Sequence, residues 1–418
     1  MSSSLLVTQV ATALSGIIVA RALGPAGKGI IAATVVWPQL LGWVLLLGLN
    51  TASSVRVSES RDTLDYVLGN ALAYSLSIGI LGTIGGLLLL PAALGHLGHG
   101  AAASSRITVL AIPVVMLGAV VGGVNLGLGR TRHYNVMQVV TGLLVLSVSI
   151  LLVVFGAASP QTVTGAGVLI GVVALCVGAQ GLPWRQLSLA FGRLRADIAY
   201  GLRVFLTSVL ALVNVRLDIL LMSAFLGARQ IGFYSIAISA MLPIALVYSS
   251  ATTLLLPTVA KMRGARAGES PDDVSLIRRT ALRYTLVTLA VAVLIAGALP
   301  FAVPLLFGRA FEPAVTLAWI LIPGYVAQGY GAIIDAGMVG MRTPWVGNLS
   351  QGAGVVVTAT LLPVLLPAYQ ATGAAIVSSL AYTTTAAVAV WASTRIYRRG
   401  LLDAGPGGPD PAGSAVAG

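Results

Sequence analysis

The chain has 418 residues, of which 57% are apolar and only 9% are charged, and its formal net charge is +12 at pH 7. A soluble domain carries roughly 25% charged residues, so this composition excludes a water-soluble globular protein. Continuous apolar runs of about 20 residues recur along the chain, which is the length that crosses roughly 30 Å of hydrocarbon as a helix. We therefore predict an all-α polytopic membrane protein.

Twelve transmembrane helices are predicted from these apolar runs, six in each half of the chain. In order, they cover residues 5–23, 29–53, 66–92, 107–128, 135–157, 163–181, 200–224, 230–257, 282–306, 314–340, 346–367 and 371–394. The connections are short except for one charged segment, one glycine-rich segment and two basic segments. These longer connections lie at 54–65, 93–106, 182–199 and 258–281.

The predicted helices divide the chain into two lobes, a linker and a tail. We expect an N-lobe at 1–181, a C-lobe at 200–395 and a disordered cytoplasmic tail at 396–418, which is rich in glycine, proline and alanine. In the linker, 182–199, apolar residues recur at helical spacing: Trp184, Leu187, Phe191, Leu194 and Ile198. This pattern predicts an amphipathic helix lying on the inner leaflet, with a partner-docking helix as the alternative.

Basic residues are distributed unequally between the two sides of the predicted membrane. If the N-terminus is cytoplasmic, 18 of the 24 lysines and arginines fall on the cytoplasmic side. The outer side has Arg21, Lys28, Arg106, Arg229 and Arg309. This asymmetry follows the positive-inside rule, so we predict a multi-pass membrane protein with both termini cytoplasmic. The positive charge is then a sign of topology, and we expect no nucleic-acid partner.

The two halves carry a weak internal repeat. Leu23-Gly24-x4-Gly29 recurs 203 residues later as Leu226-Gly227-x4-Gly232. The fourth and tenth predicted spans align at an offset of 210, with Pro113 matching Pro323 and Asn125 matching Asp335. Both copies begin on the same side, which predicts a parallel repeat with its axis along the membrane normal. Transporters built from such repeats bind substrate between the halves.

Four short motifs carry a family resemblance that covers nearly the whole chain. They are Ala20-Arg21-Ala22-Leu23-Gly24-Pro25, Arg216-Leu217-Asp218, Leu226-Gly227-x4-Gly232-Phe233-Tyr234-Ser235-Ile236-Ala237, and Leu306-Phe307-Gly308-x2-Phe311 with the later Ile322-Pro323-Gly324. In these motifs the chain resembles polysaccharide flippases of the Wzx type, in the multidrug/oligosaccharidyl-lipid/polysaccharide (MOP) exporter superfamily.

The resemblance implies the fold, the substrate and the partners. It implies two six-helix lobes around a central cavity that alternates access. It also implies export of undecaprenyl-pyrophosphate-linked oligosaccharide across the bacterial inner membrane for polysaccharide biosynthesis. The expected partners are this anionic lipid-linked oligosaccharide, membrane lipids, and a glycan polymerase and glycosyltransferases.

Arg216 and Asp218 are the charges most deeply placed within an apolar run. Arg216 follows Arg203, at the cytoplasmic end of the seventh span, by 13 residues, or roughly 20 Å of helix. Residues two apart point to nearly opposite helix faces, so Arg216 and Asp218 do not pair with each other. In the functional interpretation, Arg216 binds a pyrophosphate or acidic sugar and Asp218 carries a proton. In the structural one, Asp218 binds another helix and Arg216 reaches outward to the interface.

Three further residues are candidates for substrate binding. Arg21 ends the first span, where reaching to the outer interface explains it equally well. Asn50 and Asn214 are possible sugar contacts, although each also suits a hydrogen bond between helices.

Three other residues are candidates for coupling or gating, together with Asp218. Asp335 lies near the C-terminus of the tenth span, where a carboxylate opposes the helix dipole, so we expect Arg342 or a cation to compensate it. Asn125 is its neutral mate in the repeat. Pro323 breaks the tenth span, and we expect either a packing kink or a bend that opens and closes the cavity.

The sequence has no P-loop, no nucleophile elbow and no Cys/His set with metal-ligand spacing. We therefore expect neither an enzyme nor a cofactor, with H⁺ or Na⁺ as the candidate coupling ion. Two alternatives to a flippase remain open on the sequence alone. One is a cation-coupled multidrug exporter of the same architecture, and the other is a non-transporting membrane scaffold of a glycan assembly complex.

Overall fold

The computed structural model describes residues 2–184, 187–265, 271–341, 343 and 345–403, which are almost entirely helical and include no strand. The α-helices are α1 (Ser2–Leu45), α2 (Leu49–Glu59), α3 (Leu64–Leu94), α4 (His99–Thr108), α5 (Ala111–Gly127), α6 (Thr131–Val154), α7 (Pro160–Gly178), α8 (Phe191–Phe225), α9 (Ala228–Ala240), α10 (Leu242–Ala265), α11 (Pro271–Phe307), α12 (Pro313–Gly340) and α13 (Trp345–Asp403). Three short 3-10 helices join them: η1 (Arg61–Thr63), η2 (Gly95–Leu97) and η3 (Arg309–Phe311). The predicted all-α fold is confirmed.

Two of the helices each run through two of the predicted spans, although α1 ends at Leu45, before the predicted end of the second span at 53. α1 reverses at Gly24, whose φ of 66° is readily accessible only to glycine, and Pro25 then starts the second half. α13 reverses in the same way at Gln370, where φ is 50°. Within the described residues, eight helices are long and apolar enough to cross a membrane, and the pair α9–α10, bent by 46°, makes a ninth. The structure is thus a polytopic helical membrane protein.

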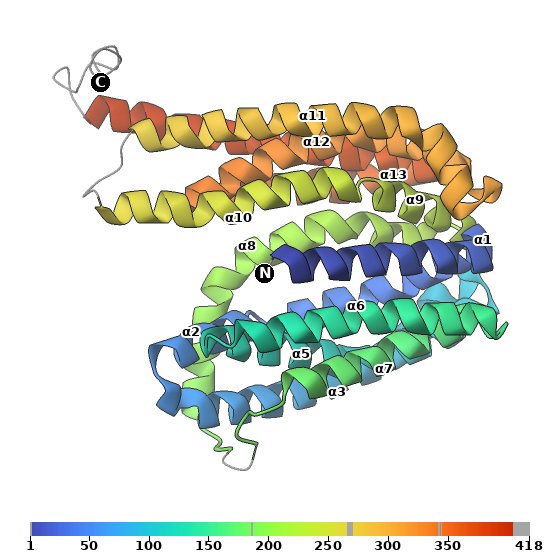
Figure 1. The fold of residues 1–418 in the computed structure, drawn as a ribbon, viewed down its shortest axis with the longest axis horizontal. Coiled ribbons are helices and arrows are strands. Elements are labelled where there is room, and N and C mark those ends of the chain that lie inside the picture. The colour runs from blue at the N-terminus through green and yellow to red at the C-terminus, as the bar shows by residue number, and fades with distance from the viewer. Residues whose placement is uncertain (1, 185–186, 266–270, 342, 344, 404–418) are drawn as a thin grey trace.

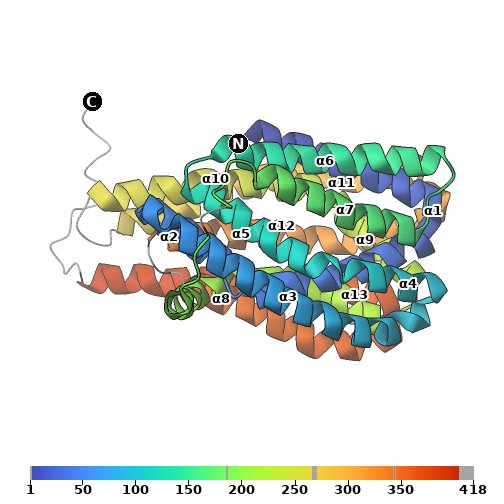
Figure 2. The ribbon, with the colours of Figure 1, turned by 90° about the horizontal axis from the view of Figure 1, so that it is seen from below.

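The helices form two lobes that lie side by side. Figure 1 shows α1–α7 in one lobe and α9–α13 in the other, while α8 runs from the first lobe into the second. The view in Figure 2, turned by 90°, shows that the helices of both lobes follow one long axis. We call the end that holds α2 and the start of α8 the α2 end, and the end that holds the Gly24 reversal the Gly24 end.

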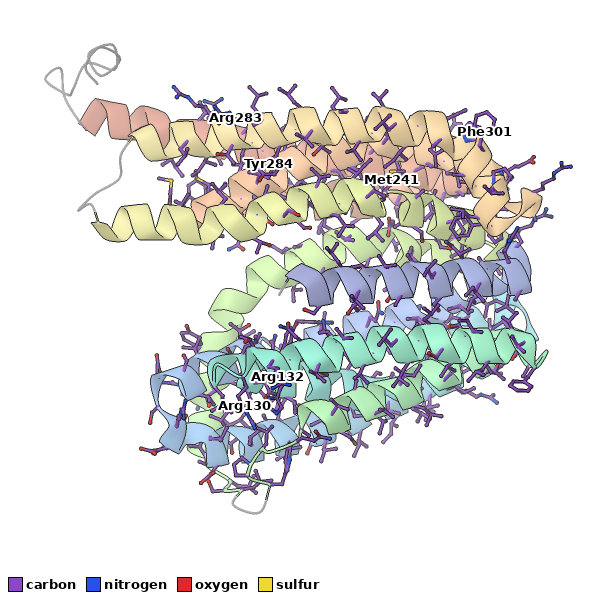
Figure 3. The ribbon with its side chains drawn as sticks, in the orientation of Figure 1. Arg130, Arg132, Met241, Arg283, Tyr284 and Phe301 are labelled. Atoms are coloured by element: carbon purple, nitrogen blue, oxygen red, sulfur yellow. The ribbon has the colours of Figure 1, made fainter. Side chains whose placement is uncertain are left out.

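Basic side chains mark the α2 end. Arg130 and Arg132, where α5 meets α6, and Arg283 on α11 lie there, whereas Phe301 lies toward the Gly24 end on the same helix (Figure 3). Apolar side chains on the outer faces of the lobes are well exposed, among them Leu88 and Phe301 at 74% and 78%. Such exposure is unfavourable in water and is expected where a helix faces lipid.

The two lobes share one apolar core at the Gly24 end and have separate cores elsewhere. The shared core joins Ala33 and Val36 of α1 to Ile231 and Phe233 of α9 and to Phe311 of η3. The N-lobe has its own core between α2, α3 and α5, and the C-lobe has another between α10, α11, α12 and α13. The lobes therefore share a core at one end and have separate cores at the other.

The linker between the lobes differs from its prediction. Residues 187–190 are not helical, and 191–199 are the first turns of α8, which continues unbroken through the predicted seventh span. Asn70 explains the non-helical segment, because its amide donates to Ala190 O (3.0 Å) and accepts from Ala190 N (2.9 Å). Leu194 packs against the N-lobe core, so part of the predicted lipid-facing stripe contacts protein.

Candidate functional site

A cavity of about 660 Å³ lies between α1 of the N-lobe and α8–α12 of the C-lobe. Its N-lobe wall comes from both halves of α1, because the Gly24 reversal brings them side by side. Its C-lobe wall comes from the helices that follow Arg216. The cavity therefore lies where a transporter made of two repeats binds substrate.

Two basic side chains enter this cavity from opposite lobes. Arg216 comes from α8, and Lys28 comes from the first turn after the Gly24 reversal. Lys28 reaches across to the first half of α1, since a methyl group added at Gly16 would lie 3.9 Å from its Nζ. The lining residues include no aspartate or glutamate, and no described carboxylate lies within 4.0 Å of either cation. The only charged side chains among the lining residues are therefore two basic ones, and neither has an ion-pair partner among the described residues.

The remaining lining has polar groups from both lobes and one apolar wall. The N-lobe contributes Gln9 and Thr12 on α1, and the C-lobe contributes Ser239, Tyr248, Tyr325 and Gln328. The α11 wall is apolar throughout, with Ile295, Ala298, Leu299, Ala302, Val303, Leu306 and Phe307. An anionic group and an apolar chain could therefore be bound in the same cavity.

Asp218 faces away from the cavity into the core of the C-lobe, where its side chain is 1% exposed. Its Oδ2 accepts hydrogen bonds from the hydroxyls of Tyr234 on α9 (2.5 Å) and Ser378 on α13 (3.3 Å). These two hydroxyls also contact each other at 2.8 Å. Asp218 thus connects three helices, and Arg216, two residues earlier on α8, points the other way, as helical periodicity requires.

Asp335 belongs to a second polar network in the C-lobe. Its carboxylate accepts hydrogen bonds from Ser350 Oγ (2.9 Å) and Gln351 Nε2 (3.2 Å). Gln351 Oε1 in turn accepts from Asn214 Nδ2 at 3.0 Å, which links α12, α13 and α8. The compensation expected from Arg342 lies outside the described residues. Among the described residues, neutral donors from α13 bind the carboxylate.

The other predicted site residues do not line the cavity. Arg21 is exposed at the Gly24 end. Asn50 is half-buried in α2 and packs its carbonyl against Gly123. Asn214 is buried, and its Oδ1 has no hydrogen-bond partner within the described part of the chain.

The two remaining coupling candidates also lie away from the cavity lining. Asn125 is fully buried, and its Nδ2 donates to Val121 O (2.9 Å) and Gly178 O (2.8 Å). Pro323 is exposed within α12, which continues past it to Gly340. Of the predicted substrate-binding residues, only Arg216 is brought to the cavity.

Lys28 is the main residue that the sequence reasoning missed. The apolar pattern predicts a second span that begins at residue 29, which leaves Lys28 in the outer loop. The helix in fact starts at Pro25, and a proline after a glycine is a helix-start signal that could have placed Lys28 inside the span. Tyr248 and Tyr325 gave no comparable signal, because buried tyrosines are common in helical cores.

Sequence and structure comparisons place the chain among membrane proteins of known architecture. A sequence model of the family described as polysaccharide biosynthesis protein matches residues 18–316. No curated protein matches the chain significantly.

Several solved structures are similar over nearly the full length. One is a multidrug resistance MATE family transporter of the MOP superfamily in an inward-facing conformation, with a TM-score of 0.73, 15% identity, and coverage of 94% of this chain and 96% of that one. Another is the lipid II flippase MurJ in an inward closed conformation, with a TM-score of 0.76, 12% identity, and coverage of 96% and 90%. A third is a MOP superfamily transporter from Pyrococcus furiosus, with a TM-score of 0.62, 15% identity, and coverage of 94% and 93%. These similarities establish a shared fold.

Proposed function

We propose that this chain, which belongs to the polysaccharide biosynthesis protein family and has the fold of MOP superfamily transporters, is a flippase. In this proposal it moves a lipid-linked oligosaccharide with a pyrophosphate head group across the bacterial inner membrane. Both termini are cytoplasmic in this proposal. The expected substrate is an undecaprenyl-pyrophosphate-linked oligosaccharide, and a glycan polymerase and glycosyltransferases would act on either side of this step.

The pair Lys28 and Arg216 in a cavity whose lining has no acidic residue is the observation that supports this proposal. A pyrophosphate has several anionic oxygens, and a guanidinium can bind two of them in parallel while an ammonium neutralises a third. A cation buried in the membrane without a partner is costly, which favours a ligand as its partner. Each of the two lobes thus contributes one positive charge to the same head group.

The rest of the cavity suits the other parts of such a substrate. The apolar wall of α11 would face the lipid chain, while Gln9, Thr12 and Gln328 offer donors and acceptors to sugar hydroxyls. The substrate's amphiphilic character is matched by this division of the lining.

The alternatives fit the cavity less well. A cation exporter needs carboxylates in the cavity, and the two cations would repel its substrate. A scaffold needs no charged cavity between two lobes. The apolar core that the two lobes share lies at the Gly24 end, so opening and closing at the other end, as alternating access requires, would not disrupt it.

Coupling to an ion is proposed for the buried carboxylates of the C-lobe. Asp218 and Asp335 belong to separate hydrogen-bond networks in the C-lobe, and neither lines the cavity. H⁺ would act by neutralising a carboxylate, and Na⁺ by binding to oxygen ligands. Asn214 Oδ1, buried without a described partner, adds one unused acceptor beside Gln351.

Binding of farnesyl pyrophosphate to the purified protein in lipid nanodiscs tests the head-group site. We expect Arg216→Gln and Lys28→Gln each to weaken binding by about tenfold or more, the scale of one lost charge-assisted hydrogen bond. Arg309→Gln is the matched control, because Arg309 is exposed and does not line the cavity. Farnesol, which has the chain without the charge, should bind equally to all of these proteins. Tight binding of tetraphenylphosphonium instead of farnesyl pyrophosphate would favour the cation exporter.

A further inference from the structure

The two copies of the repeated Leu-Gly-x4-Gly turn meet at the Gly24 end of the molecule. A methyl group added to Gly29 would lie 1.7 Å from Ala228 O. One added to Gly232 would lie 1.9 Å from Pro25 O. Ala228 and Gly232 follow Pro25 and Gly29 by the same 203 residues. Each lobe therefore presents the same glycine and the same carbonyl to the other, and the contact is reciprocal.

The reciprocal contact is made by backbone on backbone. At Gly29 and Gly232, a hydrogen on Cα occupies the position that Cβ has in other residues. This hydrogen points at a carbonyl oxygen of the other lobe. Such Cα–H···O contacts recur where membrane helices approach closely. A single added methyl group could not fit at either glycine without moving one helix away from the other. Both obstructing atoms belong to the backbone, so a change of side-chain rotamer cannot relieve the clash.

The surroundings of this contact are tightly packed. Gly29 and Gly232 are themselves buried. Phe233 and Phe311, which are 5% and 1% exposed, stack edge to face with ring centroids 6.4 Å apart in the shared core. Trp37 Nε1 of α1 donates to Ser223 Oγ of α8 at 3.2 Å, which adds a hydrogen bond between the lobes. The two lobes are therefore in close contact here.

Lys28 connects this contact to the cavity. It lies between Pro25 and Gly29 in the same helical turn and lines the cavity together with Arg216. Because Lys28 belongs to the N-lobe and Arg216 to the C-lobe, their separation depends on how close the lobes are at this end. The turn that holds the lobes together therefore also positions one of the two cations.

We propose that Gly29 and Gly232 form the seal that closes the cavity at the Gly24 end, and that parting this seal withdraws Lys28 from the cavity it shares with Arg216. The sealed protein presents two cations to an anionic ligand, and the opened protein presents one. The ligand therefore stabilises the sealed state by its difference in affinity, and opening weakens its binding and favours release. The second part rests on the anion-binding function proposed above, whereas the seal itself does not.

Accessibility of a cysteine in the cavity tests the seal without any substrate. Ser239 lines the cavity and differs from cysteine by one atom, so Ser239→Cys serves as the reporter in a Cys176→Ser background. A membrane-impermeant maleimide is applied from the Gly24 side to protein in oriented vesicles. We expect Gly29→Ala and Gly232→Ala each to raise the labelling rate from that side by about tenfold or more, because the clash depopulates the sealed state.

Gly118→Ala and Gly297→Ala are the matched controls, since nothing lies within 4 Å of a Cβ at either position. Both should label at the parent rate. Equal labelling of the Gly29→Ala variant and these controls overturns the seal. Correct folding of each variant is verified by its elution as a single species on size-exclusion chromatography.

Spin labels test the same motion with both seal glycines intact, so the result does not depend on how the alanine variants fold. Ala26 and Ala310 are exposed and lie on opposite lobes at the Gly24 end; both are replaced by labelled cysteines.

Inorganic pyrophosphate should increase the population with the shorter distance between the two spin labels, and Lys28→Gln should remove this effect. If pyrophosphate binds but the populations do not change, the link between Lys28 and the seal is wrong. If it does not bind, the head-group proposal fails, while the labelling rates still decide the seal.

Discussion

Lys28 and Arg216 face one cavity from opposite lobes, and no described carboxylate lies within ion-pair distance of either. Lys28 is held by the helical turn after Gly24, and Arg216 by α8, which is also the helix that links the lobes. A change in the relative position of the lobes thus changes the spacing of the two charges. This relationship connects the architecture of the chain to the ligand that the cavity can hold.

Export in cells should depend on the charge at position 216. Arg216→Ala should abolish glycan export, whereas Arg216→Lys should retain part of it, because lysine keeps the charge but lacks the planar fork that binds two phosphate oxygens. Surface glycan is measured in cells that make each variant in place of the wild type, with membrane levels of the protein quantified in parallel. Wild-type export by Arg216→Ala, at normal protein levels, would mean that the residue only reaches toward the interface.

Substitutions at Asp218 should separate a structural from a coupling role. Asp218→Ala removes the acceptor of the Tyr234 and Ser378 hydroxyls. One hydroxyl can then donate to the other, which leaves one buried donor unpaired at a cost of roughly 1–3 kcal/mol. Asp218→Asn keeps an oxygen acceptor, so we expect its melting temperature to stay closer to that of the wild type. If Asp218 carries a proton, Asp218→Asn should still fold but lose export. If Asp218→Asn folds and exports normally, the role of Asp218 is structural and consists of connecting α8, α9 and α13.

Most of the fold was predictable from the sequence, because continuous apolar runs of membrane-spanning length have few alternatives in lipid. The repeated turn, Leu23–Gly29 and Leu226–Gly232, was also recognisable in the sequence as a pair of equivalent positions 203 residues apart. The prediction did not reveal that these two turns touch. Contacts between segments 203 residues apart leave no periodicity in the sequence.

The linker and the polar networks were harder to predict for the same reason. Asn70 holds Ala190 in a non-helical conformation through two backbone hydrogen bonds across 120 residues, and local helix propensity indicates the opposite. For Asp335, the donors Ser350 and Gln351 lie on α13, and no spacing in the sequence marks them as its partners. In the linker, a tertiary contact decided the outcome over a local preference.

The ion pair between Arg56 and Asp197 should stabilise the junction of α2 with the start of α8. Arg56 Nε lies 2.9 Å from Asp197 Oδ1, and the side chain of Asp197 is only 6% exposed. Arg56→Ala would leave this carboxylate without its partner, at a cost of about 1–2 kcal/mol after allowance for the 38% exposure of Arg56. Limited proteolysis should then cleave the segment before Phe191 faster.

Arg61→Ala provides the control for this ion pair. Arg61 is an exposed arginine of the neighbouring η1 and has no ion pair in the described part of the chain. Its removal should change the unfolding free energy by less than about 0.5 kcal/mol. Equal proteolysis rates for Arg56→Ala and Arg61→Ala would show that the pair does not hold the junction.

Cysteine labelling in intact cells should establish the orientation of the chain. The basic residues of the α2 end, such as Arg130, Arg132 and Arg283, predict that this end is cytoplasmic. In a Cys176→Ser background, cysteines at position 265 or 405 should therefore resist an impermeant maleimide added outside. Ala26→Cys, exposed at the Gly24 end, should react readily and serves as the positive control. Efficient labelling at 265 together with protection at 26 would invert the topology. The seal at Gly29 and Gly232 would then close the cytoplasmic side of the cavity rather than the outer side.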